Sequence, residues 1–475
     1  MEILNYIGGE FYPAKNNEWI DNYNPATDEV IGKVSKSTID DVEIAVSAAK
    51  KALPAWSALS TKDRATYLLK LSTKIEENLV ELSLLETRDT GKPIHTSKNI
   101  DIPRSALNLK FFADFASNQN QEEFYGNGME NFVERSPLGV VGCISPWNLP
   151  LYLFTWKIAP ALMAGNTVIA KPSEFTPTTA FMLSKFCKEI NLPAGVLNIP
   201  HGLGPEVGSA IVDHPEIKAI SFTGSTRVGK IIAKSCGQQM KKFSLELGGK
   251  NPFIITENAN LETAISTAMR AAFTNQGQVC LCGSRIYIHE KVYDEVKNGM
   301  LKKLTKLTPQ NPEDETSRFG SLTSKEHYEK VSKFVELAKN DSGIIVHQHK
   351  HSMSKGNFIS PMLLENVKPD HPINQEEIFG PIATLQNYQT EEELITLANN
   401  TEYGLCASIF TEDKEQARKL ASKIESGIVW INTWLARDLR TPFGGVKASG
   451  FGREGGNYAL NFFSEPKNIC FLGDK

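Results

Sequence analysis

Several features that mark secreted, membrane-bound or nucleic-acid-binding proteins are missing from this 475-residue sequence. Its seven cysteines are odd in number and scattered, so they do not form the framework of a disulfide-rich domain. The N-terminus has no basic segment followed by an apolar one, as a secretory signal would have. Both absences predict a reducing cytoplasm. The net charge of −4, with no basic cluster, also disfavours nucleic acid and anionic membranes as partners.

An uninterrupted apolar run is missing as well. Residues 136–156 carry no charge, and after Lys157 a second uncharged run reaches residue 170, so length alone permits a membrane span. Prolines and glycines interrupt the first run, and a lipid-exposed helix cannot leave that much backbone without hydrogen bonds. The segment is therefore predicted to be a strand, a loop and a helix buried in a soluble core.

The length exceeds the size at which a single hydrophobic core stops growing, which predicts two or three domains. Short strands and turns are expected over residues 1–40, followed by helices over 40–53, 62–77, 79–90 and 100–115. The pattern from residue 132 to 144 is strand-like. Beyond it, short apolar runs alternate with helical patterns, as in a parallel α/β sheet.

Two such α/β units are expected, the second starting near Gly248. The first has predicted strands at residues 167–170, 195–199 and 218–222 and helices at 178–190 and 205–213. The second has predicted strands at 252–255, 285–288, 343–346, 382–385, 407–410 and 428–431 and helices at 261–274, 325–339, 390–399 and 414–424. The final apolar run, residues 462–472, has no partner nearby in the sequence. It is expected to pair with a distant strand or another subunit, which predicts oligomerisation.

A thiol on a glycine turn is the feature around which the candidate site is arranged. Residues 273–285 place Cys280 between an alanine-rich helical segment and a β-like run. A thiolate there can attack an electrophilic carbon if a base, an oxyanion site and an acceptor for what leaves are present. The alternative is a buried structural thiol. Cys282 stands two residues on, but no second Cys or His pair occurs at zinc spacing, so no metal site is predicted.

Two polar residues are candidates to serve this thiol. Asn148 lies between two prolines at the end of an apolar strand, and an amide held by a rigid loop can stabilise an oxyanion. An ordinary turn asparagine is the alternative. Glu246 has apolar neighbours before a double glycine, and apolar surroundings raise a carboxyl pKa toward the value that suits a general base. A surface glutamate at a strand end is the alternative.

Nucleotide-binding features follow the strands of the first unit. Lys171 and Glu174 come after the strand at 167–170, at the sheet edge where ligands bind, and either can take the hydroxyls of an adenine ribose. A solvated charge pair is the alternative. Residues 221–230 read as a strand, a small-residue turn and a helix start, whose free N–H groups suit a pyrophosphate. This stretch fails as a triphosphate-binding loop because Ile231 stands where Ser or Thr should hold magnesium, and the glycines at 202–208 match a dinucleotide fingerprint only loosely.

Six short motifs, taken in order, resemble the NAD(P)-dependent aldehyde dehydrogenase superfamily: residues 146–148, 171–174, 222–225, 246–249, 277–280 and 377–381. The similarity covers nearly the whole chain. It implies an α/β fold with two Rossmann-like parallel-sheet domains and a small β oligomerisation element. The NAD-binding domain would comprise residues 1–118 and 138–247, the catalytic domain residues 248–446, and the oligomerisation strands residues 119–137 and 458–475.

The resemblance also implies roles for individual residues. Cys280 would be the nucleophile, Glu246 the general base, and Asn148 with the backbone N–H of Cys280 the oxyanion site. NAD is the expected cofactor, since an acid at position 174 repels the 2′-phosphate of NADP. The expected cofactor-binding residues are Ile144, Pro146, Trp147, Lys171, Ser173, Glu174, Gly204, Phe222, Thr223, Gly224, Ser225, Leu247, Gly248, Glu377 and Phe379.

By the same resemblance, the thiolate adds to an aldehyde, hydride passes to the nicotinamide, and a thioester remains. Water activated by Glu246 hydrolyses that thioester to a carboxylic acid. A member that passes the thioester to coenzyme A is disfavoured because Glu246 supplies the hydrolytic base. A catalytically inactive relative with a binding or structural role is the alternative of another class, and the presence of thiol, base and amide together argues against it.

A narrower similarity, to the 2-aminomuconate and 2-hydroxymuconate semialdehyde dehydrogenases, rests on residues 280–285, 432–445 and 450–456. Substrates of that kind carry a distal carboxylate, which a fork-shaped guanidinium binds well. Arg104 and Arg453 are the expected ligands of this carboxylate, whereas Arg437 and Arg440 are expected to brace the loop near the site. A betaine- or broad-range aliphatic aldehyde dehydrogenase is the second hypothesis. A homodimer or homotetramer is the expected assembly.

Overall fold

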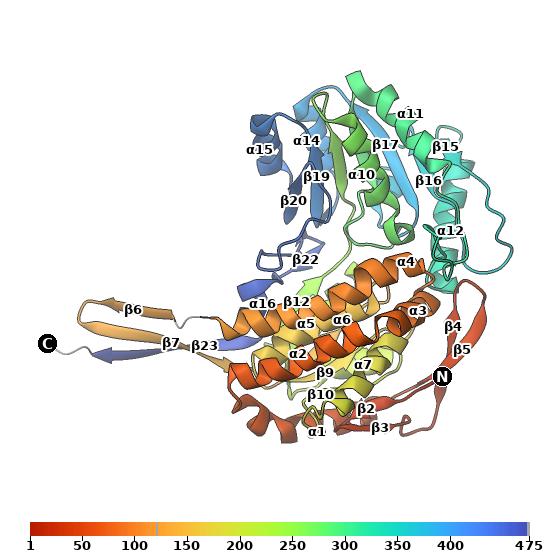
Figure 1. The fold of residues 1–475 in the computed structure, drawn as a ribbon. Helices are drawn as coiled ribbons and strands as arrows, with labels where there is room; N and C mark the ends of the chain where they lie inside the picture. The colour runs from red at the N-terminus through yellow and green to blue at the C-terminus, as the bar shows by residue number, and fades with distance from the viewer. Residues whose placement is uncertain (120–121, 473–475) are drawn as a thin grey trace.

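A six-stranded sheet organises one half of the molecule (Figure 1). The computed structural model describes residues 1–119 and 122–472. The strand order is β10-β9-β8-β11-β12-β22, in which β22 alone runs antiparallel to its neighbour. The strands are β8 (Val140–Ile144), β9 (Thr167–Lys171), β10 (Leu197–Asn198), β11 (Ile217–Thr223), β12 (Lys242–Glu246) and β22 (Gly450–Phe451).

Helices cover both faces of this sheet. One apolar core joins the sheet to α2, α5, α6 and α7, and a second joins the opposite face to α1, α8 and α9. The bounds are α1 (Ile39–Ser57), α2 (Thr61–Glu77), α3 (Leu79–Thr90), α5 (Ile102–Ser117), α6 (Pro150–Met163), α7 (Thr178–Glu189), α8 (Ser209–Asp213), α9 (Thr226–Gln238) and the short α4 (Ile94–Thr96). π-Helical turns at Ser97–Asp101 and Gly204–Gly208 precede α5 and α8.

A seven-stranded sheet organises the other half, with the order β15-β16-β17-β14-β13-β19-β20. All neighbours are parallel except β15 and β16. The strands are β13 (Pro252–Ile255), β14 (Arg285–His289), β15 (Ile345–Gln348), β16 (Met362–Glu365), β17 (Ile382–Tyr388), β19 (Cys406–Phe410) and β20 (Ile428–Ile431). The helices are α10 (Leu261–Phe273), α11 (Tyr293–Leu304), α12 (Lys325–Asn340), α13 (Pro372–Gln375), α14 (Glu391–Asn399) and α15 (Lys414–Lys423).

A three-stranded arm extends away from both α/β halves in Figure 1. It consists of β6 (Glu122–Gly126), β7 (Met129–Pro137) and β23 (Ser464–Leu472), with β7 in the middle. The C-terminal strand β23 therefore pairs with a strand that is distant in sequence, which was one of the two expectations for it. Residues 120–121 and 473–475 of the predicted oligomerisation strands lie outside the described residues.

Small elements complete the architecture. The N-terminal strands form a three-stranded sheet in the order β1-β5-β4 and the hairpin β2-β3. Their bounds are β1 (Glu2–Ile3), β2 (Asn5–Ile7), β3 (Glu10–Tyr12), β4 (Trp19–Asn24) and β5 (Glu29–Ser35). Near the C-terminus, β18 (Tyr403–Gly404) pairs with β21 (Val446–Lys447), and α16 (Gly456–Phe462) precedes β23.

The predicted α/β class with parallel sheets is confirmed. The strand-like run at 132–144 differs from its prediction, because it divides into β7 in the arm and β8 in the first sheet. Gly139 between them has φ +122°, a conformation that lets the chain change direction there. The uncharged run is β8, a loop and the buried helix α6, as expected, and no helix within residues 1–119 and 122–472 is long and apolar enough to span a membrane.

Strand β22 has the largest consequence for the site. After the second sheet is complete, the chain returns to the first sheet, where Gly450 pairs with Glu246 at the end of β12. The residues that flank β22 therefore lie beside Glu246, although more than 190 positions separate them in the sequence.

Candidate active site

The turn that carries Cys280 has an unusual backbone. Helix α10 ends at Phe273, and Asn275, Gln276 and Gly277 then follow with φ values of +51°, +56° and +75°. A Cβ at Gly277 would lie 2.2 Å from the carbonyl oxygen of Gly380, so only glycine fits there. Side-chain-bearing residues in this conformation store strain, which persists only where the surroundings impose it. The turn thus holds the thiol in a position that the local sequence would not adopt alone.

Side-chain hydrogen bonds to the backbone fix the part of the turn that starts at Cys280 and continues after it. Asn251 donates from Nδ2 to the carbonyls of Cys280 and Cys282, at 2.7 and 2.9 Å. Trp434 donates from Nε1 to the carbonyl of Leu281 at 2.8 Å. Cys282 itself is buried in the apolar core. The sequence reasoning missed Asn251 and Trp434, because nothing local marks them as supports of a turn some 30 and 150 residues away.

Asn148 is brought directly against this turn. Its side chain is 4% exposed, and Nδ2 donates to the carbonyl of Gln278 at 2.9 Å. The side chain of Asn275 donates to the carbonyl of Asn148 at 3.1 Å. The two segments are thus tied in both directions, which is more than an ordinary turn asparagine requires. An amide fixed here has a second N–H available for a developing oxyanion.

Glu246 ends strand β12 and is 5% exposed. Among the described residues, Oε1 has no hydrogen-bond partner. Burial raises the pKa of this carboxyl well above its ordinary value, and the negative charge of Glu454 raises it further, whereas Lys157 and Arg437 oppose the shift. A carboxyl of raised pKa with a free oxygen suits a general base near neutral pH. The surface-glutamate alternative does not hold for this residue.

A buried ionic group stands behind Glu246. Lys157 donates to Glu454 at 2.9 Å, and the indole Nε1 of Trp156 donates to the other oxygen of the same carboxylate at 2.6 Å. Lys157 is fully buried. The sequence reasoning assigned no role to either charge. The signal was available for Lys157, which is the single charge between two uncharged runs.

The thiol of Cys280 is half-buried, and burial raises its pKa. The carboxylates of Glu377 and Glu246 raise it further, and Arg437 lowers it. The thiol is therefore protonated at neutral pH in this state. Glu246 and Cys280 belong to neighbouring segments, since a Cβ at Gly249, three residues after Glu246, would lie 2.8 Å from the carbonyl oxygen of Cys280.

In the predicted cofactor site, Lys171 and Glu174 form a largely buried ion pair. The Nζ–Oε2 distance is 3.0 Å, Lys171 is 2% exposed, and the backbone N–H of Gly204 donates to Glu174 Oε1 at 2.9 Å. Burial raises the pKa of Glu174, but Lys171 and the Gly204 N–H outweigh it and hold that pKa below its ordinary value. The pair lies at the carboxyl end of β9 and is not the solvated pair of the alternative hypothesis.

The turn between β11 and α9 has the features of a pyrophosphate cradle. Ser225 caps the helix, accepting from the N–H of Val228 at 3.4 Å, and the buried hydroxyl of Thr223 has no partner among the described residues. A Cβ at Gly224 would lie 2.4 Å from the ring of Phe222. Free helix N–H groups, an unpaired hydroxyl and a bare backbone together fit a dinucleotide phosphate.

Glu377 lies on the loop between α13 and β17 and reaches the two glycines that follow β12. It accepts the N–H of Gly249 at 3.0 Å, and a Cβ at Gly248 would lie 2.2 Å from its Oε2. The remaining predicted cofactor residues lie on the segments already described: Ile144 ends β8, Pro146 and Trp147 lie on the loop after β8, Ser173 follows β9, and Leu247 follows β12.

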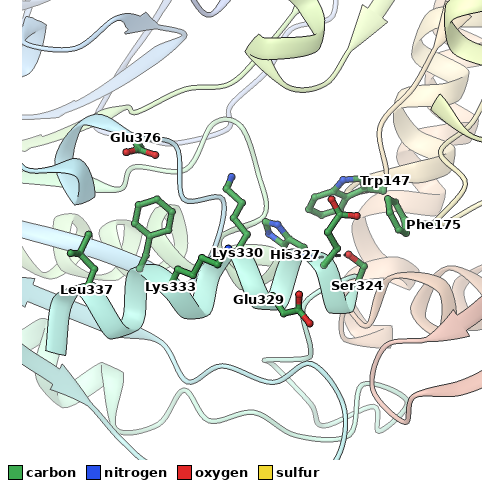
Figure 2. A pocket seen from close by; sticks show the side chains of 11 residues that line it. Trp147, Phe175, Ser324, His327, Glu329, Lys330, Lys333, Leu337 and Glu376 are labelled. Atoms are coloured by element: carbon green, nitrogen blue, oxygen red, sulfur yellow. Dashed lines mark hydrogen bonds between the residues drawn. The ribbon is translucent and has the colours of Figure 1, made fainter. Parts of the chain in front are cut away.

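A cleft of about 600 Å³ opens beside Trp147, against helix α12 (Figure 2). His327, in the first turn of α12, has its ring 4.9 Å from that of Trp147 and hydrogen-bonds through Nε2 to the carbonyl of Phe379 at 2.7 Å. Phe379 has φ +59° and its ring packs edge-on against Trp147 at 5.3 Å. His327 thus joins two predicted cofactor residues from different halves of the chain, and the sequence reasoning missed it. Burial lowers its pKa to about 4, so the ring is neutral.

Two arginines approach the site with unused donors. Arg104 and Arg437 each have a buried Nη2 without a hydrogen-bond partner in residues 1–119 and 122–472. Arg104 lies over the ring of Tyr152 at 5.2 Å, and Arg437 over that of Phe443 at 3.8 Å. Arg437 also lies over the ring of Trp156 at 5.1 Å, and Tyr152 and Trp156 are one turn apart on α6, so both arginines pack on the same helix. Unpaired buried guanidinium nitrogens suit an anionic ligand.

Arg453 and Arg440 are held differently. Arg453 donates from Nη1 to the carbonyls of Gly445 and Gly452, at 3.0 and 2.6 Å. Arg440 is exposed and pairs with Asp438 at 2.5 Å, which fits the predicted loop-bracing role. Arg437 therefore joins the expected residues Arg104 and Arg453 as a candidate ligand of a substrate carboxylate.

The chain is similar in sequence and in fold to several known proteins. The aldehyde dehydrogenase family model matches residues 11–469. A 2-aminomuconic semialdehyde dehydrogenase of Danio rerio is 44% identical, covering 99% of this chain and 98% of the relative, and a 2-hydroxymuconic semialdehyde dehydrogenase of Pseudomonas sp. (strain CF600) is 40% identical, covering 99% of each. The NAD+ complex of an aldehyde dehydrogenase from Bacillus cereus has a TM-score of 0.96 at 37% identity, covering 99% and 96%. A betaine aldehyde dehydrogenase from Staphylococcus aureus with NAD+ has a TM-score of 0.95 at 34% identity, covering 100% and 95%.

Proposed function

The chain belongs to the aldehyde dehydrogenase family and is an NAD-dependent enzyme, and from that premise we propose how its residues divide the reaction. Cys280 is the nucleophile, Glu246 is the general base, and Asn148 with the backbone N–H of Cys280 binds the oxyanion. The observation that carries this assignment is the convergence of the three side chains from separate elements. Asn148 bonds to the Cys280 turn, and the charge of Glu246 acts on the thiol.

The protein's own groups account for most steps. Glu246 takes the proton of Cys280, and the sulfur adds to the aldehyde carbon while Asn148 stabilises the oxygen. Bound NAD supplies the acceptor for the hydride that leaves that carbon. Glu246 releases that proton to solvent and then accepts a proton from water, whose oxygen attacks the thioester carbon. The carboxylic acid leaves as the sulfur departs as a thiolate, and the proton on Glu246 returns to that sulfur.

The test is the production of NADH from an aldehyde. Cys280→Ala should abolish it, whereas Cys282→Ala should keep most of the wild-type kcat because that thiol is buried in the core. Wild-type turnover by Cys280→Ala would refute the assignment.

The cofactor residues follow the geometry of the nucleotide side. The β11–α9 turn with Ser225 receives the pyrophosphate, Lys171 and Glu174 the adenine ribose, and Glu377 with Phe379 the nicotinamide half. The ionised state of Glu174 supports NAD in preference to NADP, because a carboxylate repels the 2′-phosphate. Glu174→Gln should improve NADP use relative to NAD, as measured by the two kcat/KM values.

For the substrate, we infer 2-aminomuconate or 2-hydroxymuconate 6-semialdehyde. Relatives named for these substrates are 37–44% identical along nearly the entire chain. The site adds a physical reason, because Arg104 and Arg437 carry buried nitrogens that have no hydrogen-bond partner in the described part of the chain and can bind a distal carboxylate. Two such bonds to a charged group are worth roughly 1.5–3 kcal/mol each.

Single alanine variants test this carboxylate site. Arg104→Ala and Arg437→Ala should each raise KM for a muconic semialdehyde about 10-fold or more, and change KM for a simple aliphatic aldehyde little. Arg440→Ala is the matched control, since that side chain pairs with Asp438 at the surface. Equal effects on both aldehydes would favour the broad-range aliphatic or betaine hypothesis. If Arg104→Ala and Arg453→Ala discriminate between the substrates and Arg437→Ala does not, Arg104 and Arg453 form the carboxylate site.

The arm supports the proposal of a homo-oligomer. Its strands expose large apolar side chains, namely Phe124, Tyr125, Met129, Phe471 and Leu472. Exposed apolar groups on a projecting sheet mark a protein interface. Charged substitutions at Phe124 and Phe471 should reduce the molecular mass measured by light scattering. The cytoplasmic location remains a prediction.

A further inference from the structure

Lys92 lies in a fully enclosed ionic group outside the machinery assigned above. It is 0% exposed, and Nζ lies 2.5 Å from Asp101 and 3.4 Å from Glu86, which are 1% and 0% exposed. Glu86 belongs to α3, Lys92 follows the end of that helix, and Asp101 ends the π-helical turn before α5. Three charged side chains are thus removed from water together.

The charges of the group do not balance, so its two carboxylates differ in their relation to the ammonium. Two carboxylates face one ammonium, and burial raises the pKa of Glu86 above its ordinary value, so the close pair is Lys92 with Asp101. Replacing a buried ion pair by apolar side chains is often neutral or stabilising, so stability is a weak reason for such a group. More informative is the third group to which the ammonium of Lys92 donates a hydrogen bond.

The remaining hydrogen bond of Lys92 goes to the proposed oxyanion residue. Nζ donates to the backbone carbonyl of Asn148 at 2.9 Å. An ammonium has three N–H donors, and Asp101, Glu86 and the Asn148 carbonyl take all three. The same carbonyl accepts from Asn275 in the strained turn. The backbone carbonyl of Asn148 therefore accepts two hydrogen bonds, one from the ammonium of Lys92 and one from the side-chain amide of Asn275.

The opposite end of the group reaches the helix that carries Arg104. Asp101 ends the Ser97–Asp101 π turn, and α5 continues from Ile102 with Arg104 three positions after Asp101. π-Helical turns occur often at functional sites. One ammonium thus connects the loop of the oxyanion amide with the start of the helix that presents a substrate arginine.

We propose that Lys92 is a positioning residue, which fixes the backbone of Asn148 so that its amide faces the carbon attacked by Cys280. The proposal rests on the oxyanion role of Asn148 given above. Lys92 acts through Asn148 and does not itself touch the substrate. Because Lys92 also bonds to Asp101, the position of the Asn148 amide depends on the start of α5 as well.

A double-mutant cycle tests the connection. Asn148→Ala should lower kcat about 10²- to 10³-fold, the usual loss for one oxyanion donor. Lys92→Met should lower kcat about 10- to 100-fold in the wild-type background and less than about 3-fold in the Asn148→Ala background, because the group it positions is then absent. KM for NAD should change less than about 3-fold in each variant. Lys98→Met is the matched control, since that lysine is partly exposed and pairs with Glu315 at the surface.

The outcomes separate the two proposals. An equal factor for Lys92→Met in both backgrounds, or an unchanged kcat in the wild-type background, would overturn the positioning role and leave the oxyanion site intact. An unchanged kcat in Asn148→Ala alone would overturn the oxyanion role and the positioning role with it. If Lys92→Met does not fold, Asp101→Asn replaces it in the cycle, because it keeps the ammonium and loosens its anchor, and the same non-additivity is required.

Discussion

The thiol turn and the carboxylate that faces it are built in opposite ways. The turn is held by Asn251 and Trp434 and contains three successive residues with positive φ. Glu246 has a buried oxygen with no partner among the described residues, and burial, with the charge of Glu454, raises the pKa of its carboxyl. The proposed nucleophile depends on a fixed position, and the proposed base depends on a pKa raised by its surroundings.

The same contrast appears in the two buried lysines. Lys92 bonds to the backbone of Asn148, so its effect is geometric. Lys157 bonds to Glu454, whose charge raises the pKa of Glu246, so its effect is electrostatic. Similar ionic groups thus serve different needs on the two sides of the site.

The largest effect should come from removing the base while the turn stays intact. Glu246→Gln should lower steady-state kcat about 10²- to 10⁴-fold, since the thioester then lacks activated water. A pre-steady-state burst on the order of one NADH per subunit should remain but should form more slowly, because the thiol keeps its position and loses the carboxylate that takes its proton. Stopped-flow absorbance measures both quantities. If the burst disappears along with the steady-state rate, the position of the Cys280 thiol and proton transfer by Glu246 do not contribute separately to the reaction.

The fixed position itself can be broken at Gly277. Gly277→Ala places a Cβ against the carbonyl of Gly380 at a positive φ, which should lower the free energy of unfolding by about 1–3 kcal/mol and lower kcat. Gly237→Ala is the matched control, since a Cβ there meets nothing within 4 Å in helix α9. Thermal unfolding and kcat, measured together, decide the matter. A Gly277 variant as active as the control would show that the thiol tolerates movement.

A smaller effect is expected at the cofactor cleft. His327→Phe removes the donor to the Phe379 carbonyl and should raise KM for NAD about 2- to 10-fold, the value of one hydrogen bond. His327→Gln keeps a donor and should recover most of the loss. Equal KM values in both variants would mean that packing against Trp147, rather than this hydrogen bond, orients Phe379.

The smallest effect in rate, and the most specific, is a shift of the pH profile. Glu454 raises the pKa of Glu246 through its negative charge, so Glu454→Gln should lower that pKa. The basic form of Glu246 is then reached at lower pH, and the acidic limb of the kcat profile should move to lower pH. Glu412→Gln, an exposed surface change, should leave the profile in place. A shift to higher pH would contradict the electrostatic role.

Sequence reasoning captured the parts of the fold that depend on local pattern. The alternation of apolar runs and helices predicted both parallel sheets, because their strands are short and buried on both faces. It failed where one stretch serves two sheets, as at 132–144, since periodicity does not record a change of partner. The strand β16 and the helix α11 were not predicted either.

By itself, the sequence determined the class of the protein and its proposed nucleophile, base and amide, because six short motifs occur together in the order typical of one family. Each of Cys280, Glu246 and Asn148 alone left a non-catalytic alternative open. Tertiary structure decided which distant groups surround them. The return of the chain through β22 brings Glu454 and Arg453 to Glu246. Packing leaves one nitrogen of Arg437 without a partner among the residues that the structure describes, while Arg453 bonds to backbone. Such choices depend on contacts between residues far apart in the chain, and no local pattern encodes them.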